Sequence, residues 1–238
     1  MDHTVLDLAR LTAEAVPASL AQWHRDHAVG DEVIVRGHWH GPLPFETIAT
    51  GAGCSVVDAV TGLGRGQWSV RRERTLPDLI GPRLRVVMVG LNPSLVAADA
   101  GVGFVGATNR FWPAAVEAGL VPLDRDPWAA FTRSAVGFTD LVKRASPRAS
   151  ELTTDEFRAG AARIRALVEW FAPTLVCFAG VTGYRKVFDR TAQLGLQPAR
   201  IGETLVYLML NPSGANAHAT RADLVEDFRR VRDLTNGA

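Results

Sequence analysis

Three continuous apolar runs, each followed by a polar turn, constrain the fold of this chain more than any other feature. The runs are RLRVVMVGLN (residues 83–92), TLVCFAG (174–180) and TLVYLML (204–210). Strands that are apolar on both faces are typical of a parallel sheet with helices on both sides. Helical spacing follows capping boxes at Thr153/Glu156 and Thr220/Asp223. The alternation predicts a three-layer α/β/α sandwich around a central, mostly parallel four-stranded sheet.

The first part of the chain has a different pattern. Residues 4–16 carry apolar side chains at helical spacing, and Pro17 follows them. Two short strand-like runs come next, DEVIVRGHWH (31–40) and CSVVDAV (54–60), and a polar, basic stretch at 65–78 ends the region. We therefore expect residues 1–75 to form a small α+β extension of unknown role, and residues 76–238 to form the main domain.

Composition excludes some classes of protein. Hydrophobic residues make up 47% of the chain and charged residues 21%, which is ordinary for a globular protein. No run approaches the roughly 20 apolar residues of a membrane span, and the N-terminus lacks the order of a signal peptide. These features predict a cytoplasmic protein without a membrane partner. Cys177 lies in an apolar run, and we expect a buried thiol rather than a disulfide.

The charge balance is nearly even but unequally distributed. The net charge is +1; residues 1–75 hold 7 basic and 9 acidic side chains, and residues 76–238 hold 19 and 16. A modest basic excess in the second part is compatible with phosphate contacts but does not by itself argue for them.

The same triplet, Asn-Pro-Ser, closes two of the predicted strands, at residues 92–94 and 211–213. Each is a good turn sequence in its own right. Sites of parallel sheets form at the carboxyl ends of strands, so both turns are expected at the edge where a site would lie. A carboxamide there can orient a water molecule through its oxygen while its NH₂ donates to a substrate. Such a site would act by positioning and by stabilising charge, because an amide does not titrate near neutrality.

Three longer stretches carry a family resemblance. They are VVMVGLNPSLVAADAGVGFVGATNRFW (86–112), VGFTDLVKRASP (136–147) and YLMLNPSGANAH (207–218), and LTTDEFRAGAARI (152–164) and GLQP (195–198) also fit. In these blocks residues 76–238 resemble the mismatch-specific uracil/thymine-DNA glycosylases, a branch of the uracil-DNA glycosylase superfamily. The resemblance implies a glycosylase-like catalytic domain over residues 76–238.

The resemblance also implies residue roles. Asn92 matches the asparagine that holds the water attacking C1′ of a flipped nucleotide, and Asn211 holds the position of a histidine in more active branches. Phe104 matches the aromatic that stacks on the extruded base; the alternative is a core phenylalanine. Leu91 and Ser94 flank the Asn-Pro step and are expected to line the base pocket, although relatives often have glycine at the place of Ser94.

Asp140, in GFTDLV, is a departure from the family. Relatives commonly carry an amide or a lysine beside the base at this position. An ionised aspartate only accepts hydrogen bonds, so it could accept from N3–H of uracil or thymine but would be repelled by misplaced O2 or O4. The alternative is an exposed helix cap or ion-pair partner.

The second Asn-Pro-Ser loop matches the loop that enters the minor groove of DNA. Ser213 and Gly214 are expected to approach a phosphate. Ala215 stands where relatives often have a bulky apolar wedge. Because alanine fills less of the space that a flipped base leaves in the stack, it would offset less of the free-energy cost of flipping. We therefore expect activity only on bases in weak pairs. Asn216 is a candidate for bonding the orphaned guanine, and His218 and Arg221 for backbone contacts; the alternative is a solvated loop.

The expected protein is a monomeric, nucleoid-associated, monofunctional glycosylase without a cofactor, acting on mismatched or damaged double-stranded DNA. Lys143 and Lys186 are the only lysines, and neither stands where an amine nucleophile would be needed. Two alternatives stay open: excision of another base (hypoxanthine, xanthine or a 5-substituted uracil), and a non-catalytic module that binds mismatched or single-stranded DNA.

Histidines cluster in the extension, at His24, His27, His38 and His40. His-x-x-His and His-x-His can bind a metal. The nearby acids are poorly spaced, however, and residues two apart on a strand share a face for no metal reason. We expect no metal, and an accessory module that packs on the main domain or touches DNA.

Overall fold

The computed structural model describes residues 5–62, 65–216 and 219–236. Its main sheet has the order β6-β5-β7-β9-β8. Strands β5 (Val86–Gly90), β6 (Val136–Asp140), β7 (Leu175–Ala179) and β9 (Leu205–Met209) run parallel, and β8 (Gly195–Leu196) pairs antiparallel with β9. The expected mostly parallel sheet is confirmed. The expected number of four strands is wrong, because the two-residue β8 is too short to carry a periodicity signal.

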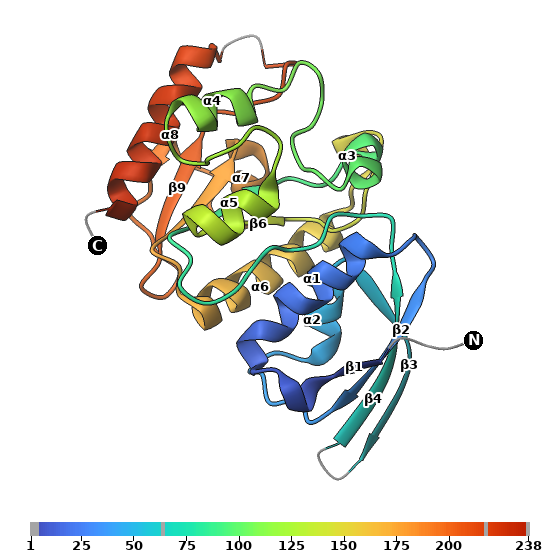
Figure 1. Cartoon of the computed structure of the whole chain (residues 1–238). Helices are drawn as coiled ribbons and strands as arrows, with labels where there is room; N and C mark the ends of the chain where they lie inside the picture. Colours follow the sequence, from blue (N-terminus) through green and yellow to red (C-terminus); the bar gives the residue numbers. More distant parts are fainter. Residues whose placement is uncertain (1–4, 63–64, 217–218, 237–238) are drawn as a thin grey trace.

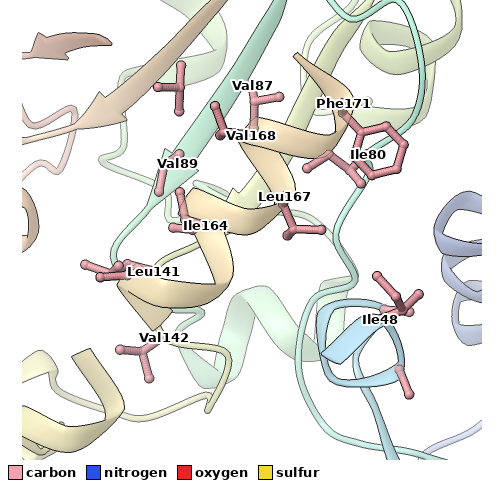
Figure 2. Packing of buried hydrophobic residues seen from close by; sticks show 14 of the residues in the cluster. Ile48, Ile80, Val87, Val89, Leu141, Val142, Ile164, Leu167, Val168 and Phe171 are labelled. Carbon is pink, nitrogen blue, oxygen red and sulfur yellow. The ribbon is translucent and has the colours of Figure 1, made fainter. Parts of the chain in front are cut away.

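Helices cover both faces of this sheet, and alternate residues of each strand supply the two cores. Val87 and Val89 face α6 (Thr154–Phe171), and Figure 2 shows Ile164 and Val168 of that helix beside them. Val86 and Met88 belong to the opposite core, with α4 (Phe111–Glu117) and α8 (Arg221–Asn236). Three further helices complete the described part of this domain: α3 (Leu95–Ala100), α5 (Pro127–Ser134) and α7 (Val181–Val187).

Both predicted capping boxes are present. The Thr153 hydroxyl accepts from the backbone N–H of Glu156, whose carboxylate accepts from the N–H of Thr153 at 2.8 Å. Thr220 and Asp223 make the same pair of bonds at the start of α8, at 2.9 and 3.2 Å. Each box satisfies backbone donors that the first turn leaves without helical partners, which explains where both helices begin.

The extension forms a second sheet of order β1-β2-β4-β3. Its strands are β1 (Val5–Asp7), β2 (Glu32–Gly37), β3 (Cys54–Gly62) and β4 (Arg65–Arg72), with α1 (Val16–Asp26) and α2 (Phe45–Gly51). The helix predicted over residues 4–16 is wrong. That stretch forms β1 and two 3₁₀ turns, Leu8–Arg10 and Ala13–Ala15. A further 3₁₀ turn, Ala149–Glu151, precedes α6 in the main domain. Pro17 begins a helix rather than ending one, since its missing N–H costs nothing in the first turn.

The two sheets share helix α6, which lies between them (Figure 1). Phe45, Ile48 and Trp68 of the extension belong to one apolar cluster with Ile164 and Phe171 of α6. The boundary at residue 75 stays a prediction, because the core runs across it. The buried thiol expected at Cys177 is confirmed, and Cys54 is a buried free thiol as well. Within the described ranges, no helix has the length and apolar character to cross a bilayer.

Candidate active site

A cavity of about 300 Å³ opens at the carboxyl ends of β5 and β6. It brings together six residues proposed from the sequence, which come from four separate segments of the chain. They are Leu91, Asn92, Ser94, Phe104, Asp140 and Ser213. Apart from the amide of Asn109, the rest of its lining is small or apolar: Leu76, Gly90, Pro93, Ala97, Gly103, Val105 and Gly106. The site therefore lies where parallel sheets place their ligands.

The amide of Asn92 is held by its nitrogen. Nδ2 donates to the Ser146 hydroxyl at 2.9 Å, to the Arg144 carbonyl at 3.2 Å and to the Pro93 carbonyl at 3.0 Å. The Ser146 hydroxyl donates its hydrogen bond to the carbonyl of Arg148 at 2.9 Å, so towards Asn92 its oxygen can only act as an acceptor. This network fixes which side of the amide is nitrogen. Oδ1 of Asn92 keeps its lone pairs, since no donor in the described part of the chain reaches it.

Phe104 presents an aromatic ring beside this amide. It stacks on Phe111, with the ring centroids 4.1 Å apart and an interplanar angle of 5°. Its backbone is left-handed, with φ of 57°, a conformation that an aromatic residue rarely adopts and that costs on the order of 1–3 kcal/mol. The ring is only half-buried and lines the cavity, so it is not simply a core side chain.

Asp140 ends β6, opposite Gly90 of β5. A Cβ at Gly90 would collide with Oδ1 of Asp140 and would lie 3.5 Å from Cζ of Phe104, so the missing side chain makes room for both groups. Asp140 is partly buried and forms no ion pair in the described ranges, which contradicts the alternative of an exposed cap or salt-bridge residue. Burial raises its pKa to about 6; Lys143 and Arg163 oppose the rise and Asp78 adds to it.

The second Asn-Pro-Ser loop lies next to the cavity. Asn211 Oδ1 accepts from the N–H of Ser213 at 3.0 Å, and of the loop residues that the structure describes only Ser213 lines the site. Asn211 instead lines a neighbouring cavity of about 250 Å³ between β5 and β7. Two residues from other segments, neither of them among the predicted site residues, hold this loop in place. Arg110 donates to the carbonyls of Ser213 and Asn216, at 2.9 and 2.8 Å, and to that of Ala219. Asp227 accepts from the N–H of Leu210 at 2.9 Å.

The remaining predicted residues have other partners or lie elsewhere. The Ser94 hydroxyl caps α3 by accepting from the N–H of Ala97 at 3.1 Å. Gly214 leaves room for Thr108, and a Cβ at Gly214 would collide with it. Arg221 pairs with Glu117 at 2.6 Å, and Ala215 is exposed. His218 lies outside the described residues. Asn216 is half-buried, and its Nδ2 donates to the Asn211 carbonyl at 3.0 Å.

The histidines of the extension do not form a metal centre in the described ranges. His38 and His40 stack, with the ring centroids 5.5 Å apart, as residues two apart on an extended segment would. His24 is buried, with its Nε2 3.2 Å from the Glu73 carbonyl. Desolvation lowers its pKa to about 4, with a smaller contribution from Arg72. Its side chain is therefore a neutral core residue at physiological pH.

Sequence reasoning missed Ser146, Arg110 and Gly90. Ser146 contacts Asn92 across 54 positions of sequence, and Arg110 reaches a loop more than 100 positions away. Local patterns carry no signal for such pairs. Gly90 offered one weak signal, since a glycine at the end of a buried strand often marks the close approach of another group.

A comparison with known protein families matches this part of the chain. The family model described as "Uracil DNA glycosylase superfamily" matches residues 77–233, which include Asn92, Phe104, Asp140 and Ser146. Among solved structures, the chain is similar to one described as a "putative Uracil DNA glycosylase" from Methanosarcina acetivorans. The two are 17% identical with a TM-score of 0.46, and the match covers 67% of this chain and 98% of that chain.

Proposed function

Because the chain belongs to the uracil DNA glycosylase superfamily, we propose that it is a monofunctional DNA glycosylase that excises uracil, and also thymine, mispaired with guanine. The observation that carries this proposal is the anchored amide of Asn92. Its nitrogen is engaged by Ser146 and Arg144, so its oxygen is left to accept a hydrogen bond in a cavity with Phe104 and Asp140.

The proposed reaction needs a positioned water molecule and no titrating base. The flipped nucleotide places its base against Phe104, and its N-glycosidic bond lengthens towards an oxocarbenium ion and a base anion. Water that donates a hydrogen bond to Oδ1 of Asn92 adds to C1′, its second proton passes to solvent, and the base leaves with the bonding electron pair. The amide contributes position rather than proton transfer. This differs from the expected division of labour, because the NH₂ of Asn92 binds the protein and not the substrate.

Phe104 supports base binding by its shape and its strain. Phe111 supports one face of its ring, and the cavity adjoins the residue. Stacking of a base on an aromatic side chain is worth about 1–3 kcal/mol and tolerates different bases. A left-handed phenylalanine persists only where surrounding contacts enforce it, which is common at ligand sites.

The loop from Asn211 to Asn216 is proposed to enter the minor groove, with Ser213 and Gly214 beside a phosphate. Arg110 binds two of its carbonyls and that of Ala219 beyond it, so the loop is shaped before DNA arrives. Ala215 is too small to replace a flipped base in the stack. We expect a preference for bases in weak pairs, since these cost least to flip.

Neither lysine is placed for a lyase step. Lys143 Nζ donates to Asp78 at 2.8 Å and to the Leu76 carbonyl at 2.6 Å. Lys186 Nζ lies over the ring of Phe157, 3.9 Å from its centroid. Neither side chain lines the cavity, which supports hydrolysis by water without an enzyme–DNA imine.

The test uses duplexes that carry uracil, thymine or hypoxanthine opposite each normal base, followed by alkali to reveal abasic sites. We expect strand breaks at G·U and G·T. We expect no covalent enzyme–DNA adduct when borohydride is added during the reaction. Asn92→Ala should abolish excision and keep DNA binding, whereas Asn236→Ala, at the far end of α8, should change neither. Breaks only at hypoxanthine would favour another base as substrate, and binding without any breaks would favour a non-catalytic module.

A further inference from the structure

The carboxyl group of Asp140 has no hydrogen-bond donor in the described part of the chain, although two cations lie near it. Lys143 Nζ and Arg163 Nη1 both bind the carboxylate of Asp78. The Thr139 hydroxyl donates to Asp78 as well, at 2.7 Å. Arg163 reaches only the backbone carbonyl of Asp140, at 2.5 Å. Both cations are therefore paired with the carboxylate of Asp78, and the side chain of Asp140 lines the cavity without either of them as an ion-pair partner.

The surroundings of Asp140 favour a neutral form. Among the residues that line the cavity it is the single titratable one. The charged groups that act on it are Asp78 from the segment before β5, Lys143 from the loop after β6 and Arg163 from α6. Gly90 of β5 and the ring of Phe104 contribute no charge. With the nearby charges largely paired among themselves, burial is the dominant influence and disfavours the anion.

A neutral carboxyl group has the hydrogen-bonding capacity of an amide. It offers one donor and one acceptor side by side, whereas a carboxylate only accepts. The imide edge of uracil carries the N3–H donor next to a carbonyl oxygen, so the neutral acid matches it at both atoms. As the glycosidic bond breaks, negative charge develops on the base oxygens. An O–H donor then stabilises that charge, and a carboxylate would repel it.

Building on the proposed function, we propose that Asp140 binds the flipped base as a neutral carboxylic acid, which replaces an amide in reading the N3–H and carbonyl edge of uracil. With a pKa of about 6 for this group, the neutral form is substantially populated in mildly acidic solution. The rate of excision is expected to fall about 20-fold between pH 5.5 and 7.5 as the group ionises. Asp140 would then determine both the base preference and the pH range of the enzyme.

The test compares single-turnover excision of uracil from a G·U duplex by the wild type and Asp140→Asn between pH 5 and 8.5. The amide keeps a donor and an acceptor but does not titrate. We expect the 20-fold decline for the wild type, a flat profile for Asp140→Asn, and a faster variant at pH 7.5. Asp124→Asn, on the exposed surface, should keep the wild-type profile. A flat wild-type profile, or the same decline in Asp140→Asn, would overturn the inference.

A second measurement separates this inference from the proposed function. Absence of uracil release from every duplex at every pH would refute the glycosylase activity. The carboxyl ¹³C resonance of Asp140 in the free wild-type protein then still decides the protonation state, and it does so if the variant fails to fold. Titration of that resonance near pH 6 supports a neutral acid, and titration below pH 5 contradicts it.

Discussion

Two buried groups with opposite responses to protons predict an unusual stability profile. His24 has a folded-state pKa of about 4 against 6.5 for the unfolded chain. As pH falls below 6.5 the unfolded state takes up the proton first, so the stabilisation is complete above pH 6.5 and is lost towards pH 4. Asp140 has a folded-state pKa of about 6 against 3.8. Here the folded state takes up the proton first, so stability rises as pH falls through 6 and stops rising below 3.8.

The two effects nearly cancel between pH 7 and pH 5. From these pKa values, His24 removes about 2 kcal/mol from the free energy of unfolding over this interval, and Asp140 adds about 1.3 kcal/mol. The wild type should therefore lose only about 0.5 kcal/mol. Carboxylates whose pKa is lowered by their partners, such as Glu156 with a pKa of about 2, respond only below this range. The interval thus isolates the two buried groups.

Single substitutions should separate the opposing effects. His24→Gln keeps a donor towards the Glu73 carbonyl but does not titrate, so this variant should gain about 1.3 kcal/mol on going from pH 7 to pH 5. Asp140→Asn should lose about 2 kcal/mol over the same interval, which moves a urea midpoint by about 1 M. Urea unfolding at the two pH values measures both changes. The exposed His40→Gln variant controls for loss of a histidine. If His24→Gln and the wild type respond identically to pH, the assignment of the acid sensitivity to His24 is refuted.

Two further substitutions test the contacts around Asn92 and β6. Ser146→Ala removes one hydrogen-bond acceptor from Asn92 Nδ2, a bond worth about 1 kcal/mol. The single-turnover excision rate should therefore fall about 3- to 10-fold, while the DNA affinity stays unchanged. The exposed Ser150→Ala is the control, and an unchanged rate in Ser146→Ala would contradict the anchoring role. Gly160→Ala places a Cβ against the Leu141 carbonyl and should destabilise the fold by about 1–3 kcal/mol in urea. In Gly81→Ala the Cβ meets Phe131 Cζ at 3.4 Å, an ordinary contact, so equal stability of the two variants would contradict this clash.

How much the sequence predicts depends on the range of the contact concerned. The apolar runs at β5, β7 and β9 and the capping box of Thr153 are local patterns, and the structure has both. The strand β8 was missed, and the helix predicted over residues 4–16 was wrong, because short strands and 3₁₀ turns depend on what they pair with. The candidate site was found in outline at Asn92 and Phe104, whose stretches resemble a known family. The side chain of Ser146 and the carbonyl of Arg144, which orient Asn92, follow the neighbouring strand β6 more than 50 positions later in the chain, so they left no local trace.

The extension has a structural connection to the base-reading strand that its sequence does not suggest. Gly51 of α2 accepts a hydrogen bond from the N–H of Asp78 at 2.8 Å, and its missing side chain leaves room for the Asp78 carboxylate. Asp78 in turn binds Thr139 and Arg163, and Arg163 binds the carbonyl of Asp140. The carboxylate that occupies the nearby cations is thus packed against the extension, and this same pairing leaves the Asp140 side chain without a cation. The extension therefore contributes to the electrostatics of the cavity without lining it.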